Sequence, residues 1–268
     1  MTAFPSLLLV GAGRMGGALL AGWREQGLSR AFIVDPSSAA QSLAGTDVSV
    51  LEDAALLPSD FSPEAVILAV KPQMAAAVLP GYARFVNTAV FISIMAGKTV
   101  QGVAEMLGGT PAVVRAMPNT PAAVRQGITV AFAGPGVFGR QQELSARLLS
   151  AVGKVAWVEQ EPMLDAVTAI SGGGPAYVFL LTELLEQAGL DQGLPPELAK
   201  SMARQTIIGS AALLAASSET PEALRVAVTS PGGTTAEALK LLRADDALPK
   251  IFKAAIQAAT ERSRELSV

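Results

Sequence analysis

The chain has 268 residues, of which 50% are hydrophobic and 16% are charged, and its net charge is −3. This length allows one large domain or two ordinary ones with a sizeable core. The absence of cysteine and histidine excludes disulfides, thiolate metal sites, cysteine nucleophiles, serine–histidine triads and dehydrogenases with a histidine acid. No basic patch stands out, so nucleic acid is not an expected partner. So little charge also favours a surface partly buried against a second copy.

The N-terminal residues do not resemble a targeting segment. They lack a basic region followed by a long apolar run and a cleavage site. No stretch reaches the roughly 18 consecutive apolar residues of a membrane span. We therefore expect a cytoplasmic protein with no membrane partner.

The first half of the chain alternates short apolar runs with helix-length segments. The runs lack polar alternation, which is typical of strands in a parallel sheet covered on both faces. Strands that alternate with helices predict an α/β fold of the Rossmann type. Strands are expected at Leu7–Val10, Ala31–Val34, Ala65–Val70, Val90–Ile94, Ala112–Met117, Ile128–Phe132 and Val155–Val158, and helices at Gly16–Gln26, Gln73–Leu79, Val100–Leu107 and Phe138–Ala151.

The second half, after Pro162, has no strand-like run and is dominated by alanine, leucine, glutamate and glutamine. This composition predicts an all-helical domain. Several of its helices begin at or beside a proline, whose fixed φ suits the first helical position. Helices are expected at Met163–Ile170, Pro175–Ala188, Pro196–Ala216, Pro221–Val228, Thr235–Ala244 and Leu248–Leu266.

Three glycines form the pattern G-x-G-x-x-G between the first strand and the first helix. Gly11 permits a sharp turn, Gly13 lets the backbone approach a pyrophosphate, and Gly16 lets helix and strand pack closely. Chance glycines in a tight turn are the alternative, but the strand–turn–helix context and a following acidic residue favour a dinucleotide. The expected cofactor-binding residues are Gly11, Ala12, Gly13, Arg14, Met15 and Gly16.

The acidic residue at the end of the second strand bears on the choice between NAD and NADP. Asp35 lies roughly 20 residues beyond the glycines, where a carboxylate accepts from the adenosine ribose. This favours NAD, because a carboxylate repels a 2′-phosphate. Ser37 and Ser38 can instead donate to that phosphate, so the sequence leaves both cofactors open. The alternative role for Asp35 is that of a turn residue before Pro36.

Two proline-containing segments end strands at the carboxyl edge of the sheet, where ligands bind in such folds. Lys71-Pro72 follows the third strand, and Met117–Pro121 closes the fifth. Asn119 can donate and accept, so it suits the nicotinamide carboxamide or the substrate. Strand termination alone explains the prolines but not Lys71 or Asn119. We therefore expect cofactor contacts from Ala69, Val70, Lys71, Pro72 and Asn119.

Two glycine-rich segments interrupt the helical half. In Ser171–Tyr177, three consecutive glycines indicate a close backbone approach or a kink between helices. In Thr229–Thr235, hydroxyls and free backbone N–H groups at a helix start favour an anion such as a small carboxylate. The alternative for this second segment is a plain helix cap by Thr234 or Thr235.

The chain resembles pyrroline-5-carboxylate reductase over its whole length. The glycine pattern is shared by many dehydrogenases. The segments Arg115–Pro121, Ser171–Tyr177 and Thr229–Thr235, in this order and spacing, are specific to the family. The residues that carry the resemblance are Gly11–Gly16, Ala69–Pro72, Arg115–Pro121, Ser171–Tyr177 and Thr229–Thr235.

The resemblance implies two domains: a dinucleotide-binding domain over residues 1–160, and a helical substrate-binding and dimerisation domain over residues 161–268. The helical domain would intertwine with its twofold mate, in dimers that often assemble into rings. The implied cofactor is NADP(H), with NAD(H) also possible. The implied reaction reduces the cyclic imine pyrroline-5-carboxylate to L-proline, the last step of proline biosynthesis. The substrate carboxylate and ring nitrogen would be held by Ser230, Gly232, Gly233, Thr234 and Thr235, with Asn119 and Lys71 near the nicotinamide.

Reduction of an imine also suits a chain without histidine. An imine is basic enough to be protonated near neutral pH, so the protein's task is orientation and desolvation. We expect Thr235 to contact the ring nitrogen and relay a proton, with Lys71 as the second catalytic residue. No metal is expected.

The chain departs from the family pattern at two places. Gly173 stands where the family usually has the second serine of S-G-S-G-P-A-Y, so one hydroxyl near the substrate is lost. Arg225-Val226-Ala227 stands where the family usually has an acidic residue before the S-P-G-G segment. A partner for the substrate or for the next subunit is therefore expected to be missing.

Three alternatives remain open. A β-hydroxyacid dehydrogenase would need a proton donor such as lysine beside the helical-domain glycines, and no lysine is found there. A general imine reductase would have no carboxylate for Thr229–Thr235 to bind. A nucleotide-sensing subunit would keep Gly11–Gly16 without needing Ser230–Thr235.

Overall fold

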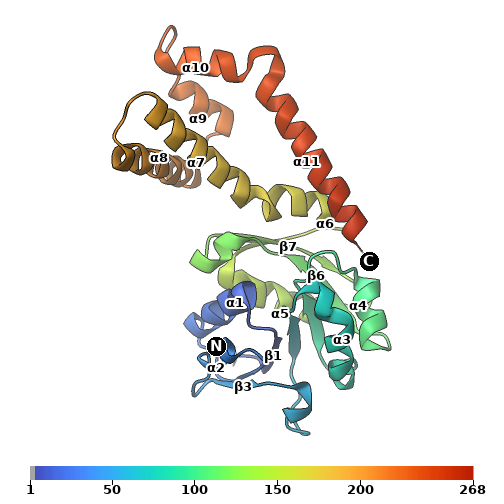
Figure 1. Cartoon of the computed structure of the whole chain (residues 1–268). Coiled ribbons are helices and arrows are strands. Elements are labelled where there is room, and N and C mark those ends of the chain that lie inside the picture. The colour runs from blue at the N-terminus through green and yellow to red at the C-terminus, as the bar shows by residue number, and fades with distance from the viewer. Residues whose placement is uncertain (1–3, 268) are drawn as a thin grey trace. The chain divides into compact units, whose positions relative to one another are not determined.

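The computed structural model describes residues 4–267, which divide into two compact units (Figure 1). The first unit holds residues up to Gly172 together with the segment from Ala259 onward, and the second holds Gly173–Ala258. The domain boundary expected after residue 160 stays a prediction. Residues 161–172 belong to the first unit, within which the buried Asp165 accepts a hydrogen bond from Ser263 Oγ at 2.7 Å.

The first unit is built on an eight-stranded sheet in the order β3-β2-β1-β4-β5-β6-β7-β8. All neighbouring pairs are parallel except β6 and β7, which are antiparallel because a short loop without a crossover helix joins them. The α/β prediction is therefore confirmed as a mainly parallel sheet. The strands are β1 Leu7–Val10, β2 Ala31–Val34, β3 Val48–Leu51, β4 Ala65–Leu68, β5 Val90–Ser93, β6 Ala112–Met117, β7 Gly127–Ala133 and β8 Gly153–Trp157.

The sheet is covered on both faces, so alternate residues of each strand enter different cores (Figure 1). In β1, Leu7 and Leu9 join a cluster that includes Trp23 of helix α1 (Arg14–Glu25), whereas Leu8 and Val10 join a cluster that includes Tyr82. Both sets are fully buried, which explains the absence of polar alternation in the sequence.

The helices predicted for the first unit are present except between β4 and β5, whereas the short helix Ser38–Gln41 was not predicted. Between β4 and β5 one helix was expected over Gln73–Leu79, but the chain forms the 3₁₀ helix Pro72–Met74, the short α3 and the 3₁₀ helix Leu79–Phe85. Pro80 has no N–H to continue an α-helix, which accounts for the end of α3 and the 3₁₀ helix that follows it. The α-helices of this unit are α1 Arg14–Glu25, α2 Ser38–Gln41, α3 Ala75–Val78, α4 Val100–Leu107, α5 Gly139–Leu149 and α6 Met163–Val167.

The second unit contains only helices within its described residues, as predicted for this half of the chain. Its helices are α7 Gly174–Asp191, α8 Pro196–Ala216, α9 Pro221–Ala227, α10 Thr234–Leu242 and the first part of α11 Ala247–Leu266. The stretch Met163–Asp191 is long and apolar enough to span a membrane by length and composition alone. Little of this stretch is buried: Leu164 and Ala169 are its buried apolar residues, and most of its other apolar side chains reach the surface.

Candidate functional site

The predicted cofactor residues of the first unit follow strands that end at one edge of the sheet. Strands β1, β2, β4 and β6 run in the same direction, so their carboxyl ends share that edge. The strand β1 lies between β2 and β4, which is the point where the strand order reverses and where such folds bind ligands. This edge therefore receives Gly11 after β1, Asp35 after β2, Ala69–Pro72 after β4 and Asn119 after β6.

Each glycine of the turn between β1 and α1 has its own structural reason. Gly11 has a φ of +88°, and a side chain there would meet the Ala69 backbone at 2.9 Å. A side chain on Gly16 would collide with the Gly11 carbonyl oxygen. At Gly13 a side chain would meet no protein atom within 4 Å. The first and third glycines are thus required by packing, and the second keeps the approach to the helix open.

The N-terminus of α1 is suited to an anion. Gly13 is the N-cap residue and provides no side-chain hydrogen bond, and the first turn contains no acidic residue. Arg14 is the first helical residue and is exposed. The unpaired N–H groups and the positive end of the helix dipole are the features that hold a pyrophosphate in dinucleotide-binding folds. A nicotinamide dinucleotide therefore fits this turn.

The Asp35 carboxylate is fixed beside the glycine turn. One oxygen accepts a hydrogen bond from the Ala12 N–H at 2.7 Å, and the other accepts from the Ser37 N–H at 2.8 Å. Partial burial raises the pKa of Asp35, but the hydrogen bonds from Ser37 and Ala12 outweigh it and hold the pKa below its usual value. Asp35 is therefore a charged group that both shapes its own turn and supports the glycine turn.

Lys71 and Asn119 leave donors available at the same sheet edge. The Lys71 side chain is exposed and has no ion pair within residues 4–267. Asn119 Oδ1 accepts a hydrogen bond from the Ile128 N–H at 2.9 Å. This hydrogen bond orients the Asn119 amide, and its NH₂ group can donate to an acceptor of a ligand.

The predicted substrate residues lie in the second unit, at the start of α10. Gly232 has a φ of +69°, and the Gly233 N–H donates to the Ser230 carbonyl at 3.0 Å. Gly233 is the N-cap residue, so the alternative that Thr234 or Thr235 caps the helix is wrong. Both hydroxyls lack hydrogen-bond partners in the described part of the chain and are exposed. They are therefore available to a ligand.

Near the end of β6, the buried Arg115 and the partly buried Glu161 form an ion pair that was not predicted from the sequence. Arg115 Nη1 lies 3.0 Å from Glu161 Oε1, which also accepts a hydrogen bond from the Val100 N–H at the start of α4. A single arginine inside the apolar run of β6 was the available signal. Next along this strand, Met117 contacts the glycine-rich segment, since a side chain on Gly172 would lie 2.7 Å from its terminal methyl. The π-helix Thr168–Gly172 thus packs against the end of β6, which directly precedes the loop that carries Asn119.

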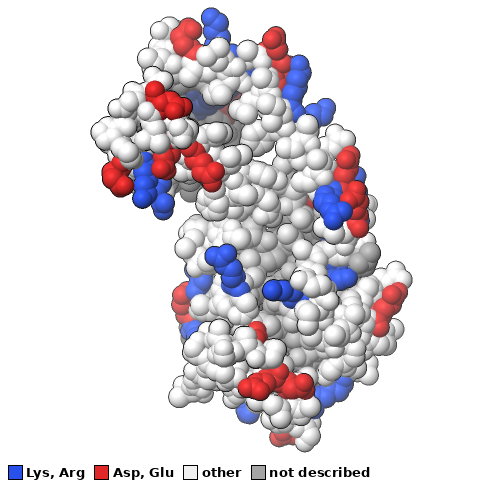
Figure 2. Space-filling view, in the orientation of Figure 1, with Lys and Arg blue, Asp and Glu red and all other residues white. Residues whose placement is uncertain are grey.

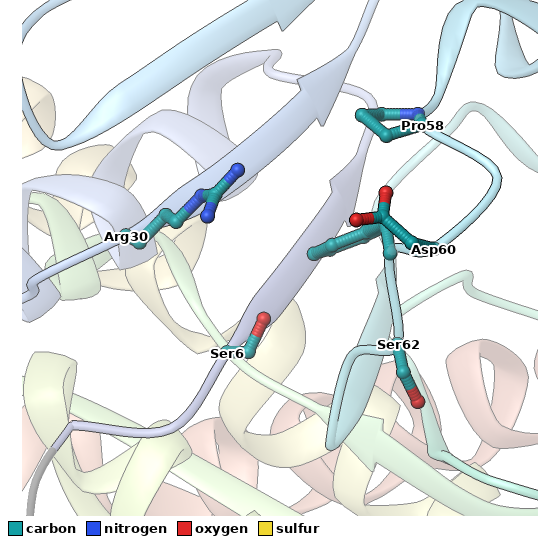
Figure 3. A pocket seen from close by; sticks show the side chains of 6 residues that line it. Ser6, Arg30, Pro58, Asp60 and Ser62 are labelled. Atoms are coloured by element: carbon teal, nitrogen blue, oxygen red, sulfur yellow. The ribbon is translucent and has the colours of Figure 1, made fainter.

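A pocket of about 240 Å³ lies at the opposite, amino edge of the sheet (Figure 3). Ser6 and Arg30, which line it, directly precede β1 and β2, and Asp60 lies before β4. None of the predicted cofactor or substrate residues lines this pocket. Within the described residues, no group of histidine, cysteine, aspartate and glutamate side chains is arranged to hold a metal.

Comparison with known proteins identifies relatives along the whole chain. Residues 161–266 match the family model for pyrroline-5-carboxylate reductase dimerisation, and residues 6–97 match the model for NADP oxidoreductase, coenzyme F420-dependent. The pyrroline-5-carboxylate reductase of Pseudomonas aeruginosa is 39% identical over 268 residues, covering 98% of this chain and 97% of its own. The chain belongs to the pyrroline-5-carboxylate reductase family. The resemblance inferred from the sequence motifs is thereby confirmed.

Solved structures of the family agree with the fold. The pyrroline-5-carboxylate reductase of Coxiella burnetii superposes with a TM-score of 0.90 at 33% identity, covering 99% of this chain and 100% of its own. The pyrroline carboxylate reductase of Plasmodium falciparum, solved with NADP bound, gives a TM-score of 0.83 at 30% identity, covering 98% of each chain. A Rossmann-type unit followed by helices is therefore the architecture of the family.

Proposed function

We propose that this protein is an NAD(P)H-dependent pyrroline-5-carboxylate reductase, which forms L-proline in the last step of proline biosynthesis. Membership of the family over the full chain supports this activity. The observation that carries it is the start of α10, where Thr234 and Thr235 hydroxyls remain unused because Gly233 caps the helix. The glycine turn of the first unit alone would suit many dehydrogenases.

The residues have distinct tasks in this reaction. A bound reduced nicotinamide dinucleotide would supply the hydride; the glycine turn and Asp35 would bind its ADP-ribose half, and Lys71 and Asn119 would lie near its nicotinamide. The turn before α10 holds the substrate carboxylate with backbone N–H groups and hydroxyls, through Ser230, Gly232, Gly233 and Thr234. The Thr235 hydroxyl contacts the ring nitrogen and relays a proton. No histidine is needed, because the imine is protonated near neutral pH.

Replacement of Thr235 by valine tests this assignment. The change keeps the shape and removes one hydrogen bond, so we expect a loss of about 1–3 kcal/mol in transition-state stabilisation. If the bond forms mainly in the transition state, kcat and kcat/KM fall together. Thr235→Ser, which retains the hydroxyl, is the matched control and should stay close to the parent. If the folded Thr235→Val protein has the same kinetics as the parent, Thr235 does not relay the proton, and the proton comes from solvent instead.

The choice of substrate separates the alternatives. We expect cofactor oxidation with pyrroline-5-carboxylate, and little with a 3-keto acid or with a cyclic imine that lacks the carboxylate. Preference for the keto acid would indicate a β-hydroxyacid dehydrogenase. Equal rates with both imines would indicate a general imine reductase whose Thr229–Thr235 turn binds no carboxylate.

We further propose that the protein is a cytoplasmic homodimer and that its dimers form a ring. The match of residues 161–266 to a dimerisation model supports the dimer, and the resemblance to the family supports the ring. Light scattering coupled to size exclusion measures the mass directly. A measured mass equal to that of one dimer would contradict the ring. Activity found in the membrane fraction after cell fractionation would contradict the cytoplasmic location.

A further inference from the structure

The loop between β6 and β7 contains a strained residue that sequence analysis did not single out. After Asn119 the chain forms the 3₁₀ helix Thr120–Val124, which ends at Arg125. Arg125 has a φ of +60° and a ψ of 19°, in the left-handed region that glycine adopts readily and other residues rarely do. Such a conformation persists where the surroundings hold it.

The Arg125 side chain is held by Glu25, the last residue of α1. Arg125 Nε donates to one Glu25 carboxylate oxygen at 2.9 Å, and Nη2 donates to the other at 2.7 Å. This bidentate geometry is the strong form of an arginine–carboxylate pair. The hydrogen bonds from Arg125 lower the pKa of Glu25, and those to Glu25 raise the pKa of Arg125. Both partners are therefore charged across the pH range in which the protein would work.

The same loop also packs on α1 through its middle. Ala122 is fully buried and joins the core cluster that contains Leu19 and Trp23 of α1. The Gln126 N–H donates to the Pro121 carbonyl at 3.1 Å, which closes the loop behind it. The helix that presents its N-terminus to the pyrophosphate thus also supports the loop that carries Asn119.

We propose that Arg125 and Glu25 are positioning residues that lock the 118–126 loop onto α1 and so set the Asn119 amide for the nicotinamide half of the cofactor. This inference rests on the dinucleotide site of the proposed function. Neither residue touches the cofactor in this scheme. Loss of the pair would let the loop shift on α1 while the glycine turn and Asp35, which are held by their own hydrogen bonds, stay in place.

The test compares two ligands that differ only in the part the loop would contact. NADH carries the nicotinamide, whereas ADP-ribose lacks it and probes the glycine turn and Asp35 alone. In Glu25→Gln we expect the Kd for NADH to rise roughly two- to fivefold, the range for a partly exposed ion pair, with the Kd for ADP-ribose unchanged. Glu64→Gln is the matched control, because it breaks the exposed Arg140–Glu64 pair of the same unit. It should change neither Kd.

A second variant separates positioning from folding. Arg125→Gly relieves the strained φ and removes the ion pair. We expect this variant to stay folded and to have a lower affinity for NADH, with its affinity for ADP-ribose unchanged. The charge-reversed double variant Glu25→Arg/Arg125→Glu should recover part of the NADH affinity. Equal losses for both ligands, or an NADH Kd that matches the Glu64→Gln control, would overturn the proposal. These titrations measure cofactor binding without the imine substrate. If a separate assay shows that the protein does not reduce the imine, the proposed function is contradicted, but the result of the titrations still stands.

Discussion

The glycines before and inside α1 differ in what a side chain would meet, and this gives a sharp test of the cofactor site. Gly13 faces open space, so Gly13→Val should leave the fold intact and lower the affinity for either dinucleotide by orders of magnitude. Gly16→Ala is the contrasting variant, since its new methyl group would collide with the Gly11 carbonyl and lower the thermal midpoint. Titration of both cofactors, with unfolding curves, checks both statements. If Gly13→Val leaves the affinity for both dinucleotides unchanged, this turn is not part of the cofactor site.

The charge of Asp35 should set the balance between the two cofactors. Its carboxylate is fixed by Ala12 and Ser37, where a 2′-phosphate would meet it. Asp35→Ser and Asp35→Asn remove the charge, so the ratio of kcat/KM for NADPH over NADH should rise roughly five- to tenfold, as for about 1 kcal/mol between unit charges at 4 Å in water. Asp53→Asn, an exposed carboxylate elsewhere in the unit, is the control. A constant ratio would make Asp35 a turn residue only.

Residues with a local signal could be predicted, whereas residues that act through distant partners could not. The glycine pattern places Gly11 and Gly13 because a tight turn is encoded within a few residues. The Arg115–Glu161 and Arg125–Glu25 pairs join residues that lie 46 and 100 positions apart. Nothing in a single sequence states which charges meet across such separations. The left-handed conformation of Arg125 is likewise decided by its contacts, since arginine has no preference for it.

The same distinction holds for elements. The buried strands β1 and β2 were predicted at their observed bounds because both of their faces are apolar. The edge strand β3, which has the same length, was missed because the exposed Ser49 interrupts its apolar run. The antiparallel direction of β7 could not be predicted from the sequence either, because it depends on the 118–126 loop and not on the residues of the strand itself.

The last helix is tied to α6 by buried polar contacts, which gives a prediction at this scale. Asp165 Oδ1 accepts hydrogen bonds from Ser263 Oγ at 2.7 Å and from Ser267 Oγ at 3.2 Å. Ser263→Ala leaves the buried carboxylate short of one donor, so the free energy of unfolding should fall by about 1–3 kcal/mol. Ser150→Ala, which removes an exposed hydroxyl, should stay within about 0.5 kcal/mol of the parent. Denaturation at one fixed protein concentration measures both, and equal stabilities would show that the tie is not needed.

For the whole molecule, the small number of charged residues leaves broad uncharged areas on the face shown in Figure 2. In the second unit many large apolar side chains are exposed, which is unusual for a monomeric protein. A family model for dimerisation matches this region, which supports the proposal that a second copy covers these side chains. On α7 and α8 these residues are Val178, Phe179, Leu180, Leu181, Leu184, Leu185, Leu198, Met202, Ile208, Leu213 and Leu214.

Folding of the second unit should therefore depend on assembly. Separated monomers would return this apolar area to water, at about 25 cal/mol for each Å², so dissociation and loss of helix should occur together on dilution. Leu184→Glu places a charge on α7 and should lower the assembled mass and the thermal midpoint. Leu56→Glu, at a side chain of similar exposure in the first unit (60% against 58%), should change neither. Sedimentation and circular dichroism over a dilution series make the measurement. A stable, active monomer at low concentration would contradict this dependence, because the exposed faces of α7 and α8 would then need no partner.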